Sequence, residues 1–248
     1  MQNIDVEWAG QVDYLEAWEL QKALVAERIA NPETPGKLLL LEHPHTYTLG
    51  RNGRLENLLL NEDELTARQI AFYQVDRGGD ITYHGPGQLV GYPILSLKRV
   101  YEQPGLGMVQ RYVTDIEEVI IQTLTKFGIN GQRFEGHRGV WVETGQGLDK
   151  IAAVGIRIQK DGVTSHGFAL NVQPDLSYFS HIIPCGIQDH GVASMAQFLD
   201  TPVTIVDVLP HLVAAFTAVF QLQTNIQWQP ISLPDFKESY VSHFIRFD

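Results

Sequence analysis

The sequence has little cysteine, little positive charge and no long hydrophobic run. Its single cysteine, Cys185, excludes an intrachain disulfide and a cysteine-rich metal site. This cysteine usage, together with the absence of a charged-then-apolar leader, predicts a reducing compartment, and we expect the cytoplasm. The longest apolar-rich run, residues 201–220, contains Asp207, Pro210 and His211. These residues are too polar, and too disruptive of a helix, for a membrane span.

Positive charge is scarce, with 18 Lys+Arg against 29 Asp+Glu and a formal net charge of -11. Because contact with phosphates is driven by positive charge, this balance argues against sequence-independent binding of nucleic acid. A local basic patch is still compatible with it. The residues that such a patch around one cleft would use are Arg51, Arg54, Arg77, Lys150 and Arg157.

Hydrophobic residues make up 44% of the 248 residues, enough for a full core in a chain of this length. We predict a single catalytic domain over residues 1–248, with a small helical part from about residue 201. Apolar residues at three- and four-residue intervals predict helices over residues 14–30, 109–127 and 203–220. Gly128 stands where the second of these helices should stop.

Strand patterns occur between and after the predicted helices. They cover residues 37–42, 72–75, 88–97, 139–143, 151–159 and 167–172. Four consecutive leucines in the first segment predict a strand buried on both faces. The last three segments are separated by short connections such as residues 160–162, so part of the sheet should be antiparallel. The predicted fold class is α/β (α+β), with a mixed, partly antiparallel sheet flanked by helices.

Cys185 stands between Pro184 and Gly186. A thiol in a stiff, sharply turned segment can be presented as a nucleophile, and a buried cysteine that only fills space is the competing interpretation.

The segment 77–88 is the most unusual stretch, with four glycines and a proline in twelve residues. Its backbone can approach a ligand closely, and Arg77, Thr82, Tyr83 and His84 offer donors at its edge. A tight hairpin between two strands is the structural alternative. The spacing fits neither a phosphate-binding P-loop nor a dinucleotide-binding fingerprint.

Lys150 directly precedes the small-residue strand that begins at Ile151. An ammonium beside a thiol favours the thiolate and lowers the thiol pKa from its reference value of about 8.5, so a Cys-Lys pair needs no histidine. An exposed turn at Asp149 and Lys150 is the alternative. The rival pair is cysteine with histidine, for which His84 is the best candidate. No histidine spacing or additional cysteine supports a metal site.

Small residues recur in two of the predicted strands, at 153–155 and 167–169. If these segments are neighbours, they leave a slot lined by backbone that suits an extended apolar chain, whose burial is worth about 0.8 kcal/mol per methylene. Ordinary core packing is the alternative.

Several of these segments together resemble one family. The stretches 77–93, 139–142, 150–155, 166–172 and 184–187 are similar, in the same order, to those of the lipoyl(octanoyl) transferases, and the resemblance covers about residues 37–200. Ala193 departs from the pattern, because family members commonly have threonine in the stretch that reads Gly-Val-Ala-Ser here. The departure concerns helix capping or loop support and leaves the nucleophile unaffected.

The resemblance implies a fold like the catalytic domain of biotin and lipoate protein ligases. The implied activity is transfer of an octanoyl group from octanoyl-acyl carrier protein to a lysine of lipoyl domains in lipoate biosynthesis. The acceptors are the lipoyl domains of 2-oxoacid dehydrogenases and the glycine cleavage H protein, and neither ATP nor a metal cofactor is required. By the same resemblance Cys185 is the acyl-thioester nucleophile and Lys150 lowers its pKa. The implied substrate-binding residues are Arg77, Gly78, Gly79, Asp80, Ile81, Thr82, Tyr83, His84, Ala153, Val154, Gly155, Gly167, Phe168 and Ala169.

Three other functions compete with this hypothesis. A lipoate-protein ligase would use ATP and no cysteine nucleophile, a binding module would have no activity, and a thioesterase would release free octanoate. We expect a monomer with a local basic rim at Arg51, Arg54 and Arg157 that faces an acidic carrier protein.

Overall fold

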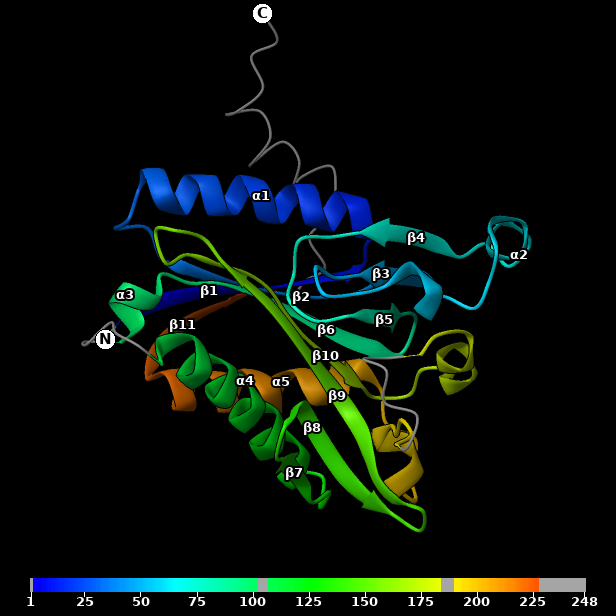
Figure 1. The fold of residues 1–248 in the computed structure, drawn as a ribbon. Coiled ribbons are helices and arrows are strands. Elements are labelled where there is room, and N and C mark those ends of the chain that lie inside the picture. The colour runs from blue at the N-terminus through cyan, green and yellow to red at the C-terminus, as the bar shows by residue number, and fades with distance from the viewer. Residues whose placement is uncertain (1, 102–106, 184–189, 228–248) are drawn as a thin grey trace, which may run out of the picture.

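The centre of the fold is a mixed sheet of eight strands (Figure 1). The computed structural model describes residues 2–101, 107–183 and 190–227. Across the sheet the order is β11 (Leu222–Gln227), β1 (Gln2–Gln11), β2 (Gly36–Glu42), β6 (Gln88–Ile94), β10 (Thr164–Asn171), β9 (Gly147–Ile158), β8 (His137–Thr144) and β7 (Gly131–Phe134). β1 runs parallel to β2 and β11, and the other neighbouring pairs are antiparallel. The predicted fold class, a mixed and partly antiparallel sheet, is confirmed.

Strand β2 shows how the layers are built. Leu38 and Leu40 lie in the large core on one face of the sheet, and Leu39 and Leu41 lie in a second core on the other face. Successive side chains of a strand point to opposite faces, so a run of leucines needs a cover on both sides. The prediction of a strand buried on both faces is confirmed.

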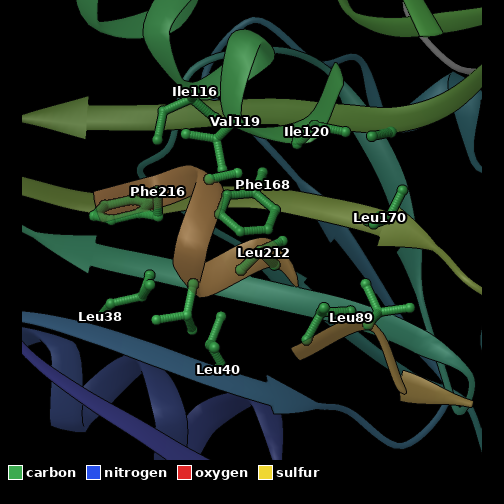
Figure 2. Packing of buried hydrophobic residues seen from close by; sticks show 14 of the residues in the cluster. Leu38, Leu40, Leu89, Ile116, Val119, Ile120, Phe168, Leu170, Leu212 and Phe216 are labelled. Atoms are coloured by element: carbon green, nitrogen blue, oxygen red, sulfur yellow. The ribbon is translucent and has the colours of Figure 1, made fainter. Parts of the chain in front are cut away.

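Helices supply those two covers. α1 (Tyr14–Ala30) lies over one face, while α4 (Met108–Thr125) and α5 (Ile205–Phe220) lie over the other (Figure 1). Figure 2 shows Phe168 of β10 among residues of α4 and α5, with Val119 and Leu212 close to its ring. Burial of an apolar side chain of this size contributes about 1.5–3 kcal/mol, so this layer supplies much of the stability.

The three predicted helices are confirmed, with ends that follow local chemistry. Asp13 caps α1 by accepting hydrogen bonds from two backbone N–H groups of its first turn. α4 ends three residues before Gly128, whose φ of +74° is a conformation that glycine adopts readily. α5 begins after Thr204, which forms a capping box with Asp207, and contains Pro210.

A three-stranded sheet in the order β4 (Ala71–Gln74), β3 (Thr46–Leu49), β5 (Ile81–His84) lies beside the large one (Figure 1). It packs with α2 (Glu62–Ala67) and the 3-10 turn Leu176–His181 around a small apolar core. β4, β6, β8, β9 and β10 match predicted strands, except that α3 (Leu97–Val100) replaces the end of the predicted strand 88–97. β1, β3, β5, β7 and β11 were not predicted.

The last described elements belong to the main body. Residues of α5 lie in the large core, and β11 pairs with β1 at the edge of the large sheet. The division into one domain with a small helical part stays a prediction. No helix in the described ranges has the length and apolar character that crossing a membrane requires.

Candidate active site

The two small-residue segments are direct neighbours. Strands β9 and β10 pair so that their central residues stand opposite one another: Gly155 with Gly167, Val154 with Phe168 and Ala153 with Ala169. Val154 and Phe168 pack into the core beneath α4 and α5. Ala169 packs into the core on the α1 side, and Ala153 faces the same way because it is its cross-strand partner. The condition on which the predicted slot depends, that the two segments are neighbours, is therefore met.

A β-bulge brings Lys150 to this same face. Val140 of β8 pairs with Ala152, but Trp141 pairs with Lys150, so Ile151 is an extra residue in β9. Both Ile151 and Ala152 lie in the large core. Strict alternation would point Lys150 away from the face that holds Ala153, and the bulge restores it to that face.

The side chain of Lys150 lies over an aromatic ring. Its Nζ is 4.7 Å from the centre of the Trp141 ring. Trp141 is buried, and its ring contacts those of Phe134, His137 and His190 at centroid separations of 5.3, 5.8 and 5.4 Å. The electron-rich face of an indole attracts an ammonium, so this contact favours the charged form of Lys150.

The backbone of Lys150 is held by the segment 191–193. The Lys150 N–H donates to the Gly191 carbonyl at 3.0 Å, and the Ala193 N–H donates to the Lys150 carbonyl at 2.9 Å. The Asp149 carboxylate accepts a further bond from the Gly191 N–H at 2.8 Å. Lys150 is therefore a half-buried strand residue, and the alternative that Asp149 and Lys150 form an exposed turn is wrong.

Cys185 lies outside the described residues. The described residues stop at Ile183 and resume at His190, and each of these two residues makes a contact with the rest of the fold. The Ile183 N–H donates to the carbonyl of Asn57 at 2.9 Å, and Nδ1 of His190 is 3.1 Å from the carbonyl oxygen of Leu148. The role of Cys185 stays a prediction.

The glycine-rich segment reaches the small-residue strands. The Gly78 N–H donates to the Ile156 carbonyl at 2.9 Å. A Cβ atom on Gly155 would lie 3.1 Å from Cδ of Arg77, and one on Gly167 would lie 2.2 Å from the carbonyl oxygen of Gly91. A neighbouring segment therefore lies where a side chain would be at both glycines, and the slot lined by the two small-residue runs stays a prediction. Their binding role stays a prediction.

Most polar side chains of this segment are turned inward. Arg77 is 7% exposed, and its guanidinium donates to the carbonyl of Thr48 at 2.7 Å, to its hydroxyl at 2.9 Å and to the carbonyl of Gly78 at 3.0 Å. Tyr83 and His84 are also buried and bonded within the protein. The expectation that these three offer donors at the edge of the loop is wrong, because those donors hold the segment itself in place.

The remaining residues of the segment have structural positions. Gly79 has a φ of +89°, which a glycine tolerates, and the carboxylate of Asp80 accepts hydrogen bonds from Asn57 and from the backbone of Ile81. Ile81 is buried in the small core, and Thr82, on the same strand, is partly exposed. The hairpin alternative is wrong, because β5 and β6 belong to different sheets.

A strained histidine stands beside the loop. His166 has a φ of +56°, is 2% exposed and has its Nε2 2.8 Å from Asp76. Burial, followed by the charges of Arg77, Arg157 and Arg51, lowers its pKa to about 3, so the ring is neutral at pH 7. Arg157 pairs with the same Asp76. Two residues of the predicted basic rim, Arg51 and Arg157, are therefore close to one another.

Comparisons with known proteins identify the family of this chain. Residues 13–217 match the family model of the lipoyl protein ligase A/B catalytic domain. The chain is 46% identical to an octanoyltransferase of Cytophaga hutchinsonii, with 88% of this chain and 92% of that protein covered. It is 44% identical to an octanoyltransferase of Chloroflexus aggregans, with 90% and 97% covered. The chain belongs to the octanoyltransferase family.

Solved structures show that the octanoyltransferase has the fold of lipoate ligases. A bi-partite lipoate protein ligase from Thermoplasma acidophilum superposes with a TM-score of 0.69 at 17% identity, covering 98% of this chain and 91% of the other. A lipoate-protein ligase A bound with ATP gives a TM-score of 0.67 at 16% identity, covering 98% and 94%. The fold expected from the sequence resemblance is confirmed.

Sequence reasoning did not single out four residues of the candidate site. Trp141 lies under Lys150, and Thr48, Gln88 and Asn171 join a buried hydrogen-bond chain around His84. Gln88 directly precedes an apolar run in β6 and Asn171 directly follows one in β10, and an amide side chain at the end of an apolar run is the signal that would have identified them.

Proposed function

We propose that this chain transfers an octanoyl group from octanoyl-acyl carrier protein to a lysine of lipoyl domains through a thioester on Cys185. Membership of the octanoyltransferase family supports the identity of the transferred group as octanoyl. The observation in this molecule that best supports the proposal is the bulge at Ile151, which puts Lys150 on the face of Ala153 and Ala169. Bulges are common next to active sites, where they re-aim a side chain.

In the first half-reaction the Cys185 thiolate attacks the carbonyl carbon of the donor thioester. A new C–S bond to Cys185 forms and the C–S bond to the carrier's pantetheine breaks. The departing sulfur takes a proton from the Lys150 ammonium. The products are octanoyl-Cys185, a free carrier thiol and a neutral Lys150.

In the second half-reaction the amine of the acceptor lysine attacks octanoyl-Cys185. A C–N bond forms, the C–S bond breaks, and neutral Lys150 takes the proton that the amine loses. Lys150 is thereby returned to its charged form beside a regenerated Cys185 thiolate. Exchange of one thioester for another is nearly balanced in energy, and formation of the amide drives the sequence forward, so neither ATP nor a metal cofactor is needed.

The ammonium of Lys150 would also prepare the nucleophile. A positive charge close to a thiol lowers the thiol pKa from about 8.5 and raises the thiolate fraction at neutral pH. The contact with Trp141 assists, because it stabilises the ammonium relative to the neutral amine.

The experiment is incubation with octanoyl-acyl carrier protein in the absence of ATP, followed by intact mass measurement. We expect a hydroxylamine-sensitive octanoyl adduct on the wild-type chain and none on Cys185→Ser. An adduct and turnover that both persist in Cys185→Ser would refute the scheme. Lipoylation that requires ATP and tolerates Cys185→Ser would indicate a ligase, and free octanoate without an acceptor would indicate a thioesterase. Normal binding of both partners by Cys185→Ala, with no transfer by the wild type, would indicate a binding module.

The acceptors we propose are the lipoyl domains of 2-oxoacid dehydrogenases and the glycine cleavage H protein. We expect the reaction in the cytoplasm, where a reducing environment keeps the single thiol free for catalysis. We expect the protein to act as a monomer, which light scattering on the purified chain would check.

A further inference from the structure

We propose that Gln88 and Asn171 are positioning residues that connect the glycine-rich segment to the backbone at Lys150. They are the middle of a hydrogen-bond chain that begins at Arg77 and ends at Ala193. The inference rests on the proposed function, because it assigns these residues a task in presenting Lys150 to Cys185.

The first half of the chain crosses the small sheet. The Arg77 guanidinium donates to the Thr48 hydroxyl at 2.9 Å, and this hydroxyl lies 3.5 Å from Nε2 of His84. Nδ1 of His84 is 2.8 Å from Oε1 of Gln88. Thr48 belongs to β3, His84 to β5 and Gln88 to β6, so the chain leaves the small sheet and enters the large one.

The donors and acceptors of this half can be assigned. Nε2 of Gln88 donates to the Tyr83 carbonyl at 3.1 Å and to Oδ1 of Asn171 at 3.0 Å, so its Oε1 is the acceptor. Nδ1 of His84 therefore carries the proton. Burial, with His43 and Arg77 nearby, holds the pKa of His84 well below its usual range, so the ring is neutral and Nε2 accepts from the Thr48 hydroxyl.

The second half reaches Lys150. Nδ2 of Asn171 donates to the Ala193 carbonyl at 3.0 Å. The Ala193 N–H in turn donates to the Lys150 carbonyl at 2.9 Å. Every side chain from Arg77 to Asn171 thus donates in the same direction, toward the segment that holds the Lys150 backbone.

The residues of this hydrogen-bond chain are all buried. The exposed fractions of its residues are 7% for Arg77, 0% for Thr48, 6% for His84, 2% for Gln88 and 4% for Asn171. A buried donor or acceptor that loses its partner has little access to water as a replacement, so a change at one link forces its neighbours to move. If a bound acyl group displaced the glycine-rich segment, the position of the Lys150 backbone would consequently change as well.

The first test uses Asn171→Leu, which keeps the volume and removes the link to Ala193. Because Cys185 is the only cysteine, the pH dependence of its alkylation by iodoacetamide reports how strongly Lys150 stabilises the thiolate. We expect the alkylation midpoint to rise by about one pH unit. We expect kcat to fall by about 10- to 100-fold with KM within a factor of three, because a shift of about 1 Å can cost that much.

The matched control is Thr123→Val in α4. Thr123 is also fully buried, and its hydroxyl donates to the Val119 carbonyl at 2.7 Å on the opposite side of the sheet. It should lose stability without moving the alkylation midpoint. An unchanged midpoint in Asn171→Leu, with no more loss of kcat than in Thr123→Val, would refute the positioning role.

A second pair of variants tests the direction of the chain and the distance over which it acts. In Asn171→Asp only the protonated carboxyl can donate to the Ala193 carbonyl, so activity relative to wild type should increase as the pH falls. Thr48→Val breaks the chain at its far end and should raise the alkylation midpoint by a smaller amount than Asn171→Leu. A flat activity ratio, or a midpoint in Thr48→Val equal to that of wild type, would overturn the connection.

Failure of the proposed function gives a different pattern. If Lys150→Met leaves the alkylation midpoint unchanged, the Cys-Lys pair itself is wrong. If Lys150→Met raises the midpoint and the Asn171 and Thr48 variants do not, only the positioning role is wrong.

Discussion

The two faces of the eight-stranded sheet are built from different kinds of residue. Toward α4 and α5 the strands present Leu38, Leu89 and Phe168, and the layer is apolar (Figure 2). Toward α1 they present Gln88 and Asn171 together with apolar residues, and these polar groups are buried and paired. An apolar layer stabilises through area and tolerates repacking, whereas a buried polar chain fixes particular atoms in place. We infer that the first face gives the fold its stability and the second positions the chemistry.

The largest effect should come from Lys150→Met. The methionine keeps most of the apolar stem over Trp141 and removes the ammonium. We expect kcat/KM to fall by about 10²- to 10⁴-fold, the range of a lost general acid-base group, with little change in the urea midpoint. Transfer assays and urea unfolding would measure the two quantities. A large loss of stability together with nearly normal turnover would contradict the division between the faces.

On the apolar face, Phe216→Ala should lower stability and leave turnover nearly unchanged. Phe216 is fully buried beneath the sheet, and its truncation should cost about 3–5 kcal/mol in the free energy of unfolding. Turnover per folded molecule should stay within a factor of three of wild type. Urea unfolding followed by circular dichroism, with activity measured at low temperature, checks both. A strong loss of kcat in the folded fraction would show that this face also positions the site.

The polar face should also make stability depend on pH. Burial lowers the pKa of His43 to about 4, and the neutral ring has its Nδ1 2.7 Å from the Val12 carbonyl. Its unfolded value is about 6.5, so the unfolded chain binds a proton first and stability is lost as the pH falls from 6.5 toward 4. We expect this residue to cost about 2 kcal/mol between pH 7 and pH 5.

Urea midpoints of wild type and His43→Asn at the two pH values would isolate this contribution. The variant should start less stable at pH 7 and lose less on acidification. Phe216→Ala, as the control on the other face, should keep the wild-type pH dependence. Parallel curves for wild type and His43→Asn would show that His43 is not the titrating group.

Trp141→Leu should have a smaller effect. It removes the aromatic face beneath Lys150, a contact worth about 1 kcal/mol. We expect a three- to tenfold slower alkylation of Cys185 at pH 7, because the ammonium is less well held. Phe134→Leu, which alters the same aromatic cluster through the contact of Phe134 with Trp141, is the control and should change the rate by less than twofold. Equal effects of the two variants would indicate general loosening of the cluster.

The sequence predicted antiparallel strands in the region that holds residues 153–155 and 167–169, because the strand-like runs there are close in the chain and separated by short turns. It also predicted the three long helices from their apolar periodicity. The alternation of Ile4, Val6 and Trp8 with acidic residues is a strand pattern in β1 that our prediction did not use. β3, with four residues, is too short for a periodicity to be recognised.

The geometry of the site could not be predicted in the same way. An extra residue at Ile151 is set by the pairing of two strands, and no local pattern marks it. The link from His84 through Gln88 to Asn171 exists because two sheets meet, so it depends on contacts between residues as far apart in sequence as Gln88 and Asn171. The family resemblance identified Lys150, and only the structure shows why its side chain faces Ala153.

The smallest effect should come from the predicted basic rim. Burial, followed by the nearby charge of Arg51, lowers the pKa of Arg157, whereas Arg54 is exposed and paired with Glu56 at 3.3 Å. We expect Arg157→Glu and Arg51→Glu to raise the apparent KM for the carrier by about two- to fivefold at low salt, with kcat unchanged. The difference should shrink as ionic strength rises, because exposed charges are screened. Arg54→Glu was predicted from sequence to act in the same way, and the pairing of Arg54 with Glu56 makes this variant the internal comparison. A KM that is unchanged in all three variants would refute the rim, and a change in Arg54→Glu alone would show that the carrier contacts Arg54 and not the other two arginines.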